Sequence, residues 1–282
     1  MKKFFSLTIV TILMSQSLFS QDDTNEKNFR FGLRTSPQVT WLRSNNSKLY
    51  ESSGVKFGFG FGLDLEFKLS KVAHILTGIG GDFLGGSQIY KSTEGYGYAT
   101  NKDNELLKNE DANWNSTASG TSFLNNLKSR KVNTTYVNLP IAMKLMTKQL
   151  SGFRYYGIFG GEVGILTKAI AQDEVEQVIG VNGTDWNLKP VSTNSDLNIA
   201  SDCIPVKLSW RVGAGAEYNL SGTTNLFFGV NFVRCFTNLY RAESKYIVGD
   251  FKNTVINGTT PRKEAKQGAF GDAVVLNVGI LF

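Results

Sequence analysis

The sequence predicts an all-β fold, an eight-stranded antiparallel up-and-down transmembrane β-barrel with short periplasmic turns and long extracellular loops. Long stretches alternate apolar with polar residues, short connections alternate with long ones, and the chain begins with an export signal. The alternation is clearest from Gly54 to Leu69, where odd positions are large and apolar and even positions are glycine or charged. Because successive side chains leave a strand on opposite faces, this apolar face needs an apolar partner outside the sheet. Lipid is the simplest such partner.

The first four alternating segments differ in regularity. Phe29–Leu42 places aromatic and aliphatic residues against arginine, glycine and glutamine, and Pro37 within it predicts a β-bulge. The second segment is Gly54–Leu69. The third, Val72–Gly86, is less regular, and the fourth, Lys131–Lys148, has a continuous aliphatic face. Each is long enough for a strand that crosses a membrane.

The last four segments keep the same pattern. Phe153–Ala169 and Pro205–Leu220 set aromatic and aliphatic residues against glycine, arginine, lysine and glutamate. Asn225–Tyr240 and Ala269–Phe282 set them against asparagine and glycine. The chain therefore ends on an apolar strand whose last residue is aromatic, as bacterial barrel chains commonly do.

The connections predict the orientation in the membrane. The short ones lie near residues 70–71, 149–152 and 221–224, and the long ones are 43–53, 87–130, 170–204 and 241–268. Strict alternation of short and long connections is typical of barrels in the outer membrane of Gram-negative bacteria, with both termini on the periplasmic side. The remaining alternative is a secreted soluble barrel of lipocalin type, which would have to bury arginine, lysine and glutamate as its core.

The N-terminus has the features of a secretory signal peptide. Two lysines precede an apolar run from Phe4 to Met14, and small and polar residues follow it. An uncleaved anchor helix is the weaker interpretation, because the run is shorter than the ~20 residues that a span needs. The predicted organisation is a signal peptide over 1–20, a periplasmic leader over 21–28 and an outer-membrane barrel over 29–282.

Composition excludes two classes of protein, those that bind nucleic acid through a strong positive charge and those held together by several disulfides. Loss of the two signal lysines lowers the formal charge from +6 to +4, too little to indicate a nucleic-acid partner. The two cysteines, Cys203 and Cys235, cannot form a disulfide framework. If Leu220 pairs with Leu226, Cys235 lies opposite Arg211, roughly 26 Å from Cys203, so both thiols are expected to be free.

Two segments resemble a known family. Tyr136–Leu145 is similar to the Tyr-x-x-aliphatic-Pro-aliphatic-x-x-Lys strand of the PorT-like outer-membrane β-barrel proteins, and Gly157–Lys168 is similar to the strand that follows it. The resemblance extends over the mature chain. It implies an eight-stranded barrel and, for the family's namesake, a role in type IX protein secretion. It implies no catalytic residues.

Charged residues at inward positions form the candidate site, a charge network in the lumen. Its members are Arg30, Arg34, Lys56, Asp64, Glu66, Asp82, Lys144, Arg154, Glu162, Lys207, Arg211 and Glu217. One interpretation is an interlocked plug that closes the bore, and the other is an ion-selective filter. The bore of eight strands is only wide enough for side chains to fill, which favours the plug.

The single histidine and the charges of the long connections are not expected to form a catalytic or metal site. His74, the only histidine, follows a short turn and is expected at the membrane interface. Asp173, Glu174 and Glu176 make the third long connection acidic. The last long connection is basic, through Lys245, Lys252, Arg262, Lys263 and Lys266. Solvated loop charge is the favoured interpretation, with docking between the two loops or contact with lipopolysaccharide as alternatives.

The expected function is therefore not enzymatic, with no catalytic residue, metal or cofactor. We expect an accessory or structural component of an envelope or secretion assembly. The alternatives are a surface-binding or adhesion barrel that acts through its long loops, and a small passive pore. The expected partners are membrane lipid, lipopolysaccharide and envelope or secretion-machinery proteins.

Overall fold

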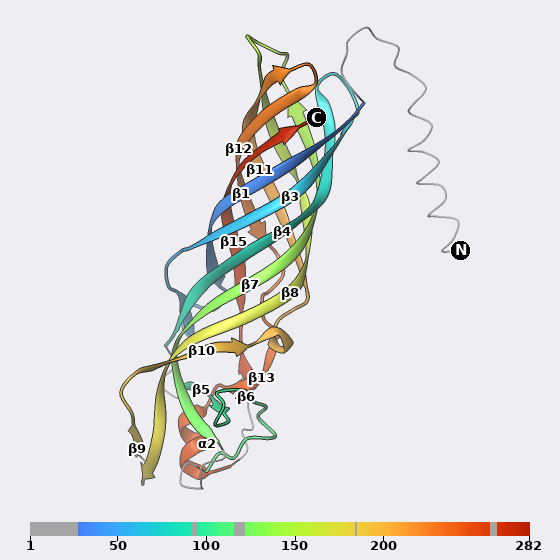
Figure 1. Ribbon diagram of the computed structural model, residues 1–282. Coiled ribbons are helices and arrows are strands. Elements are labelled where there is room, and N and C mark those ends of the chain that lie inside the picture. Colours follow the sequence, from blue (N-terminus) through green and yellow to red (C-terminus); the bar gives the residue numbers. More distant parts are fainter. Residues whose placement is uncertain (1–27, 92–94, 116–121, 184, 260–263) are drawn as a thin grey trace, which may run out of the picture.

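The computed structural model describes residues 28–91, 95–115, 122–183, 185–259 and 264–282. The predicted signal peptide and nearly all of the leader lie outside the described residues. Eight long antiparallel strands follow one another around a ring (Figure 1). They are β1 (Phe29–Ser44), β3 (Lys56–Lys68), β4 (Ala73–Tyr90), β7 (Phe123–Met146), β8 (Phe153–Asn182), β11 (Val206–Ser221), β12 (Thr224–Cys235) and β15 (Ala269–Leu281).

The ring is closed because β15 pairs with both β12 and β1. Every other neighbour in the ring is joined by an antiparallel ladder as well. The prediction of an eight-stranded antiparallel barrel is confirmed. The predicted bulge at Pro37 is wrong, since β1 keeps a constant register against β3, with Pro37 opposite Phe59. Pairing with β15 is merely interrupted at Ser36 and Pro37, where proline has no N–H to donate.

The outside of the ring carries a belt of exposed apolar side chains. Examples from around the ring are Phe31 (45% exposed), Ile141 (58%), Phe159 (52%), Val230 (53%) and Leu276 (45%). On β7 the belt runs over alternate residues from Val137 to Leu145, close to the 9–11 residues of a tilted transmembrane strand. Such a surface suits hydrocarbon and not water.

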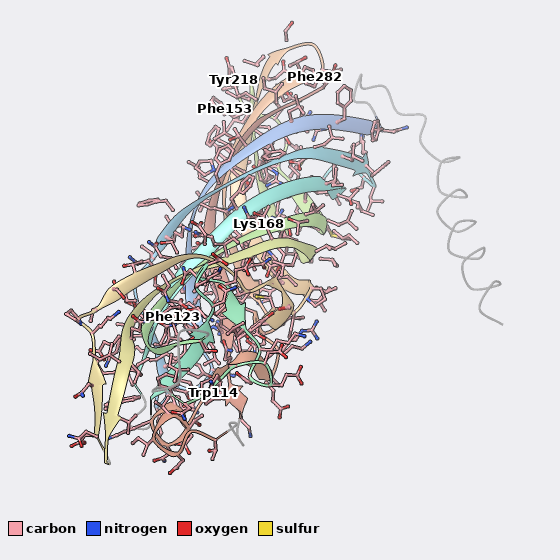
Figure 2. The ribbon with its side chains drawn as sticks, turned by 60° about the horizontal axis from the view of Figure 1, so that its bottom comes forward. Trp114, Phe123, Phe153, Lys168, Tyr218 and Phe282 are labelled. Carbon is pink, nitrogen blue, oxygen red and sulfur yellow. The ribbon has the colours of Figure 1, made fainter. Side chains whose placement is uncertain are left out.

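Aromatic residues gather at the end of the barrel where the short turns lie. Figure 2 shows Phe153, Tyr218 and Phe282 at this end. The rings of Phe153 and Tyr218 are 4.8 Å apart, and those of Phe31 and Phe282 are 5.3 Å apart. Aromatic girdles of this kind sit at the headgroup level of a bilayer.

The opposite end is a folded cap, not a set of open loops. Strands β7 and β8 run on past the belt to Phe123 and Asn182, so much of the connections predicted over 87–130 and 170–204 is strand. Smaller elements complete the cap (Figure 1). They are β2 (Tyr50–Ser52), β5 (Tyr96–Thr100), β6 (Leu106–Leu107), β9 (Asp185–Leu188), β10 (Ser192–Asn198), η2 (Ala200–Asp202), β13 (Glu243–Val248), α2 (Phe251–Asn257) and β14 (Glu264–Lys266).

The cap has its own apolar core. Tyr98, Tyr240 and Phe251 are almost fully buried, and Trp114 is 3% exposed with its indole nitrogen donating to the carbonyl of Asn109. Trp114 thus anchors an otherwise largely exposed segment of the cap to this core. Among the described residues, neither short helix could cross a bilayer.

Candidate functional site: the filled lumen and the cap

Four charged side chains fill the lumen near the short turns. Arg30 of β1 donates to both carboxylate oxygens of Glu217 on β11, at 2.9 and 3.2 Å, and also binds Glu66 of β3. Lys144 of β7 lies between the same two carboxylates and binds both. All four side chains are at most 9% exposed. Two positive and two negative groups thus neutralise one another, as buried charges require.

His74 belongs to this cluster, so its predicted interfacial position is wrong. Its side chain is 4% exposed, and its Nδ1 lies 3.6 Å from the Glu66 carboxylate. The β3–β4 ladder pairs Lys68 with His74, so regular alternation reaches the turn and directs His74 into the lumen. The imidazole adds a further polar group to the ionic cluster at the turn end.

A second set of charges crosses the middle of the lumen. Glu162 of β8 accepts from Arg211 at 2.6 Å and lies 3.2 Å from Lys207, both on β11. On the opposite wall, the Arg34 Nε donates to Asp64 at 3.1 Å. These five side chains are also at most 9% exposed. The bore is therefore occupied by ion pairs at two levels.

Three predicted members remain to be placed, and two of them, Asp82 and Lys56, form no ion pair with the described residues of these clusters. Asp82 lies at the middle level and accepts a hydrogen bond from Asn138. Arg154 is half-buried at the start of β8. Lys56 is not in the lumen at all, because its side chain lies where a Cβ of Gly85 would point, on the outer face of β4. The alternation places Lys56 on the lumen side of β3. At this position, however, β3 no longer pairs with β4, so the side chain reaches the outer face of β4 instead of the lumen.

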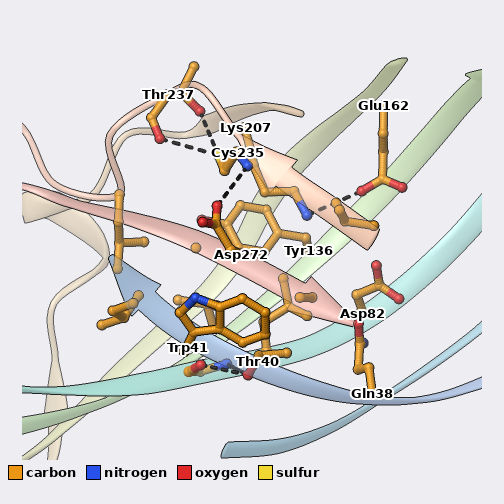
Figure 3. A pocket seen from close by; sticks show the side chains of 18 of the residues that line it. Gln38, Thr40, Trp41, Asp82, Tyr136, Glu162, Lys207, Cys235, Thr237 and Asp272 are labelled. Atoms are coloured by element: carbon orange, nitrogen blue, oxygen red, sulfur yellow. Dashed lines mark hydrogen bonds and ion pairs between the residues drawn. The ribbon is translucent and has the colours of Figure 1, made fainter. Parts of the chain in front are cut away.

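A small cavity separates the ion pairs from the cap (Figure 3). Gln38, Asp82, Tyr136, Glu162 and Lys207 contribute to its walls. Its volume is about 40 Å³, enough for a few water molecules. The Nε2 atom of Gln38 is buried without a protein partner, which is a place for one of those waters.

A buried ion pair that the sequence analysis missed seals the lumen on the cap side. Arg130 of β7 donates to both oxygens of Asp173 on β8, at 2.8 and 2.6 Å, and the two side chains are 1% and 0% exposed. The guanidinium carbon lies 5.9 Å from the Tyr98 ring centroid. Both residues had been assigned to loops. The alternation of Ala169, Ala171, Asp173 and Val175 was the signal that could have placed Asp173 inside.

Burial in the cap changes the acid–base behaviour of its side chains. Desolvation raises the pKa of the Cys203 thiol to about 12 and the pKa of the Tyr50 phenol to about 12. Burial alone would lower the pKa of Arg130, but the adjacent Asp173 carboxylate outweighs it, so that pKa lies well above its ordinary value. The cap core therefore keeps its thiol and phenol neutral and its guanidinium charged.

Both cysteines are free and buried, which confirms that prediction. The register behind it was wrong by two residues, because Cys235 lies opposite Ser209 and not Arg211. Half of the difference comes from a tighter turn, in which Ser221 pairs with Thr224, and half from a register shift between Asn219 and Ser221. The backbone of Cys203 pairs with that of Tyr240 in the cap, as an isolated antiparallel β-bridge.

The acidic residues of the third connection are paired within the barrel wall. Glu176 lies 2.9 Å from Lys128, and Glu174 accepts from Ser129 at 2.8 Å. Strand β7 supplies these partners, so docking on the basic last connection stays an alternative that the described contacts do not support. Arg262 and Lys263 lie outside the described residues. Over the described residues, no group of three or more His, Cys, Asp or Glu side chains could hold a metal ion.

The β8–β9 hairpin lies along one side of the cap (Figure 1). Trp186 of β9 packs on the cap core, with its ring 5.7 Å from that of Phe251, but other side chains of the hairpin face outward. The hairpin exposes Ile179 (56%), and Val191, just after β9, is 58% exposed. Within the described residues, β9 pairs only with β8, so its other edge offers unpaired backbone groups.

No family model and no curated protein matches this chain. Solved structures that match this chain include OprG from Pseudomonas aeruginosa (9% identity, 92% of this chain and 98% of that chain, TM-score 0.39). They also include neisserial surface protein A (7%, 91% and 98%, 0.33) and the attachment invasion locus protein Ail of Yersinia pestis (8%, 91% and 100%, 0.29).

The structure itself excludes the soluble alternative. A closed ring with an apolar outer belt and a charged interior is the architecture of an outer-membrane β-barrel, because antiparallel ladders join every pair of neighbouring strands in the ring and the outer belt presents apolar side chains to the lipid. A lipocalin has the opposite polarity. The chain is thus a barrel of the Gram-negative outer membrane.

Proposed function

We propose that this protein is a non-enzymatic, closed outer-membrane barrel that binds another envelope or surface component through its folded cap. The barrel serves as the anchor, with the short turns in the periplasm and the cap outside the cell. The single observation that carries the proposal is that the lumen is filled at successive levels while the cap is folded and exposes an apolar hairpin. A pore would require the opposite arrangement.

The hairpin supports binding through two kinds of contact. Ile179 and Val191 offer apolar side chains that are not covered by the described cap residues. The free edge of β9 can accept a further strand, a common mode of peptide recognition. An accessory role in a secretion assembly of type IX kind rests on the PorT-like resemblance alone, and adhesion to an external surface would use the same hairpin.

Photo-crosslinking in intact cells tests the proposal. A benzophenone amino acid placed at Ile179 or Val191 should form a crosslink to one defined partner. The same group at Phe159, which lies in the lipid-facing belt, is the matched control and should not form it. The proposal fails if the hairpin positions give the same products as Phe159.

Conductance tests the closed lumen separately. Purified protein in planar bilayers should show no ion-selective steps, because paired side chains occupy the bore. Glu162→Ala removes the carboxylate that binds Arg211 and Lys207 and is the variant expected to introduce leak currents. Reproducible steps from the unmodified protein would favour the passive pore.

A further inference from the structure

A groove on the outer wall of the barrel lies where β3 separates from β4. The ladder between these strands ends with the pair of Phe59 and Phe83. Beyond it, β4 is held by β1 instead, since the Thr40 hydroxyl donates to the Gly85 carbonyl at 2.6 Å and accepts from the Gly85 amide at 3.2 Å. The separation leaves a groove of about 390 Å³, within the range of small-molecule sites.

One end of this groove holds a lysine without an acidic partner. None of the described carboxylates lies within ion-pair distance of the Lys56 ammonium. Gly85 leaves the space that Lys56 occupies, because a Cβ at Gly85 would lie 2.6 Å from the lysine Cδ and 3.1 Å from its Nζ. A larger residue at Gly85 would displace the side chain. The glycine therefore lets Lys56 lie along the outer face of β4 instead of in the lumen.

The walls of the groove change from apolar to polar along the barrel. Phe57, Phe59 and Phe83 are 83%, 46% and 46% exposed and belong to the lipid-facing belt. Asn133 and Thr135 of β7 face outward on the cap side of the groove. The groove thus crosses the boundary between hydrocarbon and headgroups, with Lys56 and hydrogen-bonding side chains at the boundary.

We propose that this groove binds one phosphate-bearing anionic lipid of the surrounding leaflet. The Lys56 ammonium pairs with the phosphate, Asn133 and Thr135 lie beside it as hydrogen-bonding groups, and an acyl chain lies over Phe57, Phe59 and Phe83. Assignment to the outer leaflet rests on the proposed orientation of the cap, but binding to the groove does not. Failure of the hairpin crosslink would therefore leave this site untouched.

Native mass spectrometry of the folded protein in detergent, with dioleoyl phosphatidylglycerol as the probe, tests the site. The unmodified protein should retain one phosphatidylglycerol more strongly than the zwitterionic dioleoyl phosphatidylcholine. Lys56→Gln should weaken phosphatidylglycerol binding about fivefold, since one lysine near a membrane surface contributes about that much. Lys56→Arg should retain it. Lys102→Gln, an exposed lysine in the turn between β5 and β6, removes the same charge and should leave binding unchanged.

Two further measurements complete the test. Phe57→Ala keeps the charge but removes part of the apolar wall from a residue that is 83% exposed, so it should fold normally and bind phosphatidylglycerol more weakly. Equal phosphatidylglycerol binding by Lys56→Gln and unmodified protein would overturn the proposal. So would displacement of phosphatidylglycerol by glycerol 3-phosphate at equal concentration, because the site would then take a soluble phosphate and not a lipid.

Discussion

Strands β7 and β8 each run from the membrane into the cap, and the outward face of each strand is apolar in the membrane half and polar in the cap half. In the membrane half of β7, Val137 and Ile141 face outward while Asn138 and Lys144 face inward. In its cap half, Lys131 and Asn133 are exposed while Leu127 and Val132 are buried. Strand β8 shows the same reversal, with exposed Lys168 on the cap side of the belt (Figure 2).

The reversal coincides with a register shift between β7 and β8. Thr135 pairs with Lys168 and Tyr136 pairs with Leu166, so Thr167 is an extra residue and the parity of β8 changes beyond it. The difference between the halves teaches that the surrounding medium, and not the strand itself, decides which face is apolar. Hydrocarbon outside requires apolar side chains there and allows charges inside, whereas water outside restores an apolar core.

The largest expected effect comes from breaking the buried ion pair of the cap half. Arg130→Ala leaves the Asp173 carboxylate buried without its partner and should lower the free energy of unfolding by about 3–5 kcal/mol. Urea unfolding in phospholipid vesicles measures this loss. The double variant Arg130→Met, Asp173→Leu should recover most of it, because no charge remains buried. A single variant as stable as the unmodified protein would show that water enters this level of the lumen.

A smaller effect is expected from placing charge on the outer face of each half. Ile141→Arg faces the middle of the belt and should cost about 2–4 kcal/mol of folding free energy in vesicles. Asn133→Arg, on the same face of the same strand but in the cap half, should change it by at most about 0.5 kcal/mol. Equal costs at the two positions would place the boundary of the bilayer elsewhere.

The smallest effect is a loss of cap stability at alkaline pH. Burial raises the pKa of the Cys203 thiol to about 12, so between about pH 9 and pH 12 the unfolded chain has lost this proton and the folded chain has not. Stability must therefore fall as pH rises through this window, by roughly 1–2 kcal/mol at pH 10. Below pH 8 this thiol contributes no pH dependence.

The matched control for that effect is Cys203→Ala. Its unfolding midpoint should fall less between pH 8 and pH 10 than that of the unmodified protein, whatever its absolute stability. Maleimide labelling of the folded protein at pH 8 should leave both Cys203 and Cys235 unmodified, since both are buried. Rapid labelling of Cys203 would contradict the burial on which the shift depends.

The sequence by itself determined the barrel and its membrane face. Period-two alternation over segments such as Gly54–Leu69 assigns each side chain to one of two faces, and short turns join successive strands into neighbours. These are local properties, which is why the eight strands and their outward residues could be predicted. The inward parity of Glu66, Lys144 and Glu217 followed for the same reason.

Only the tertiary structure decided which of these groups meet. Arg30 binds Glu217 across the lumen, and alternation contains no information about residues on strands that are not neighbours. The cap also depends on contacts between distant segments, since Trp114 packs against Phe251 without a periodic pattern in either segment. Lys56 shows the limit most clearly. The alternation places Lys56 on the inward side of β3, but because β3 separates from β4 there, its side chain lies on the outer wall of the barrel.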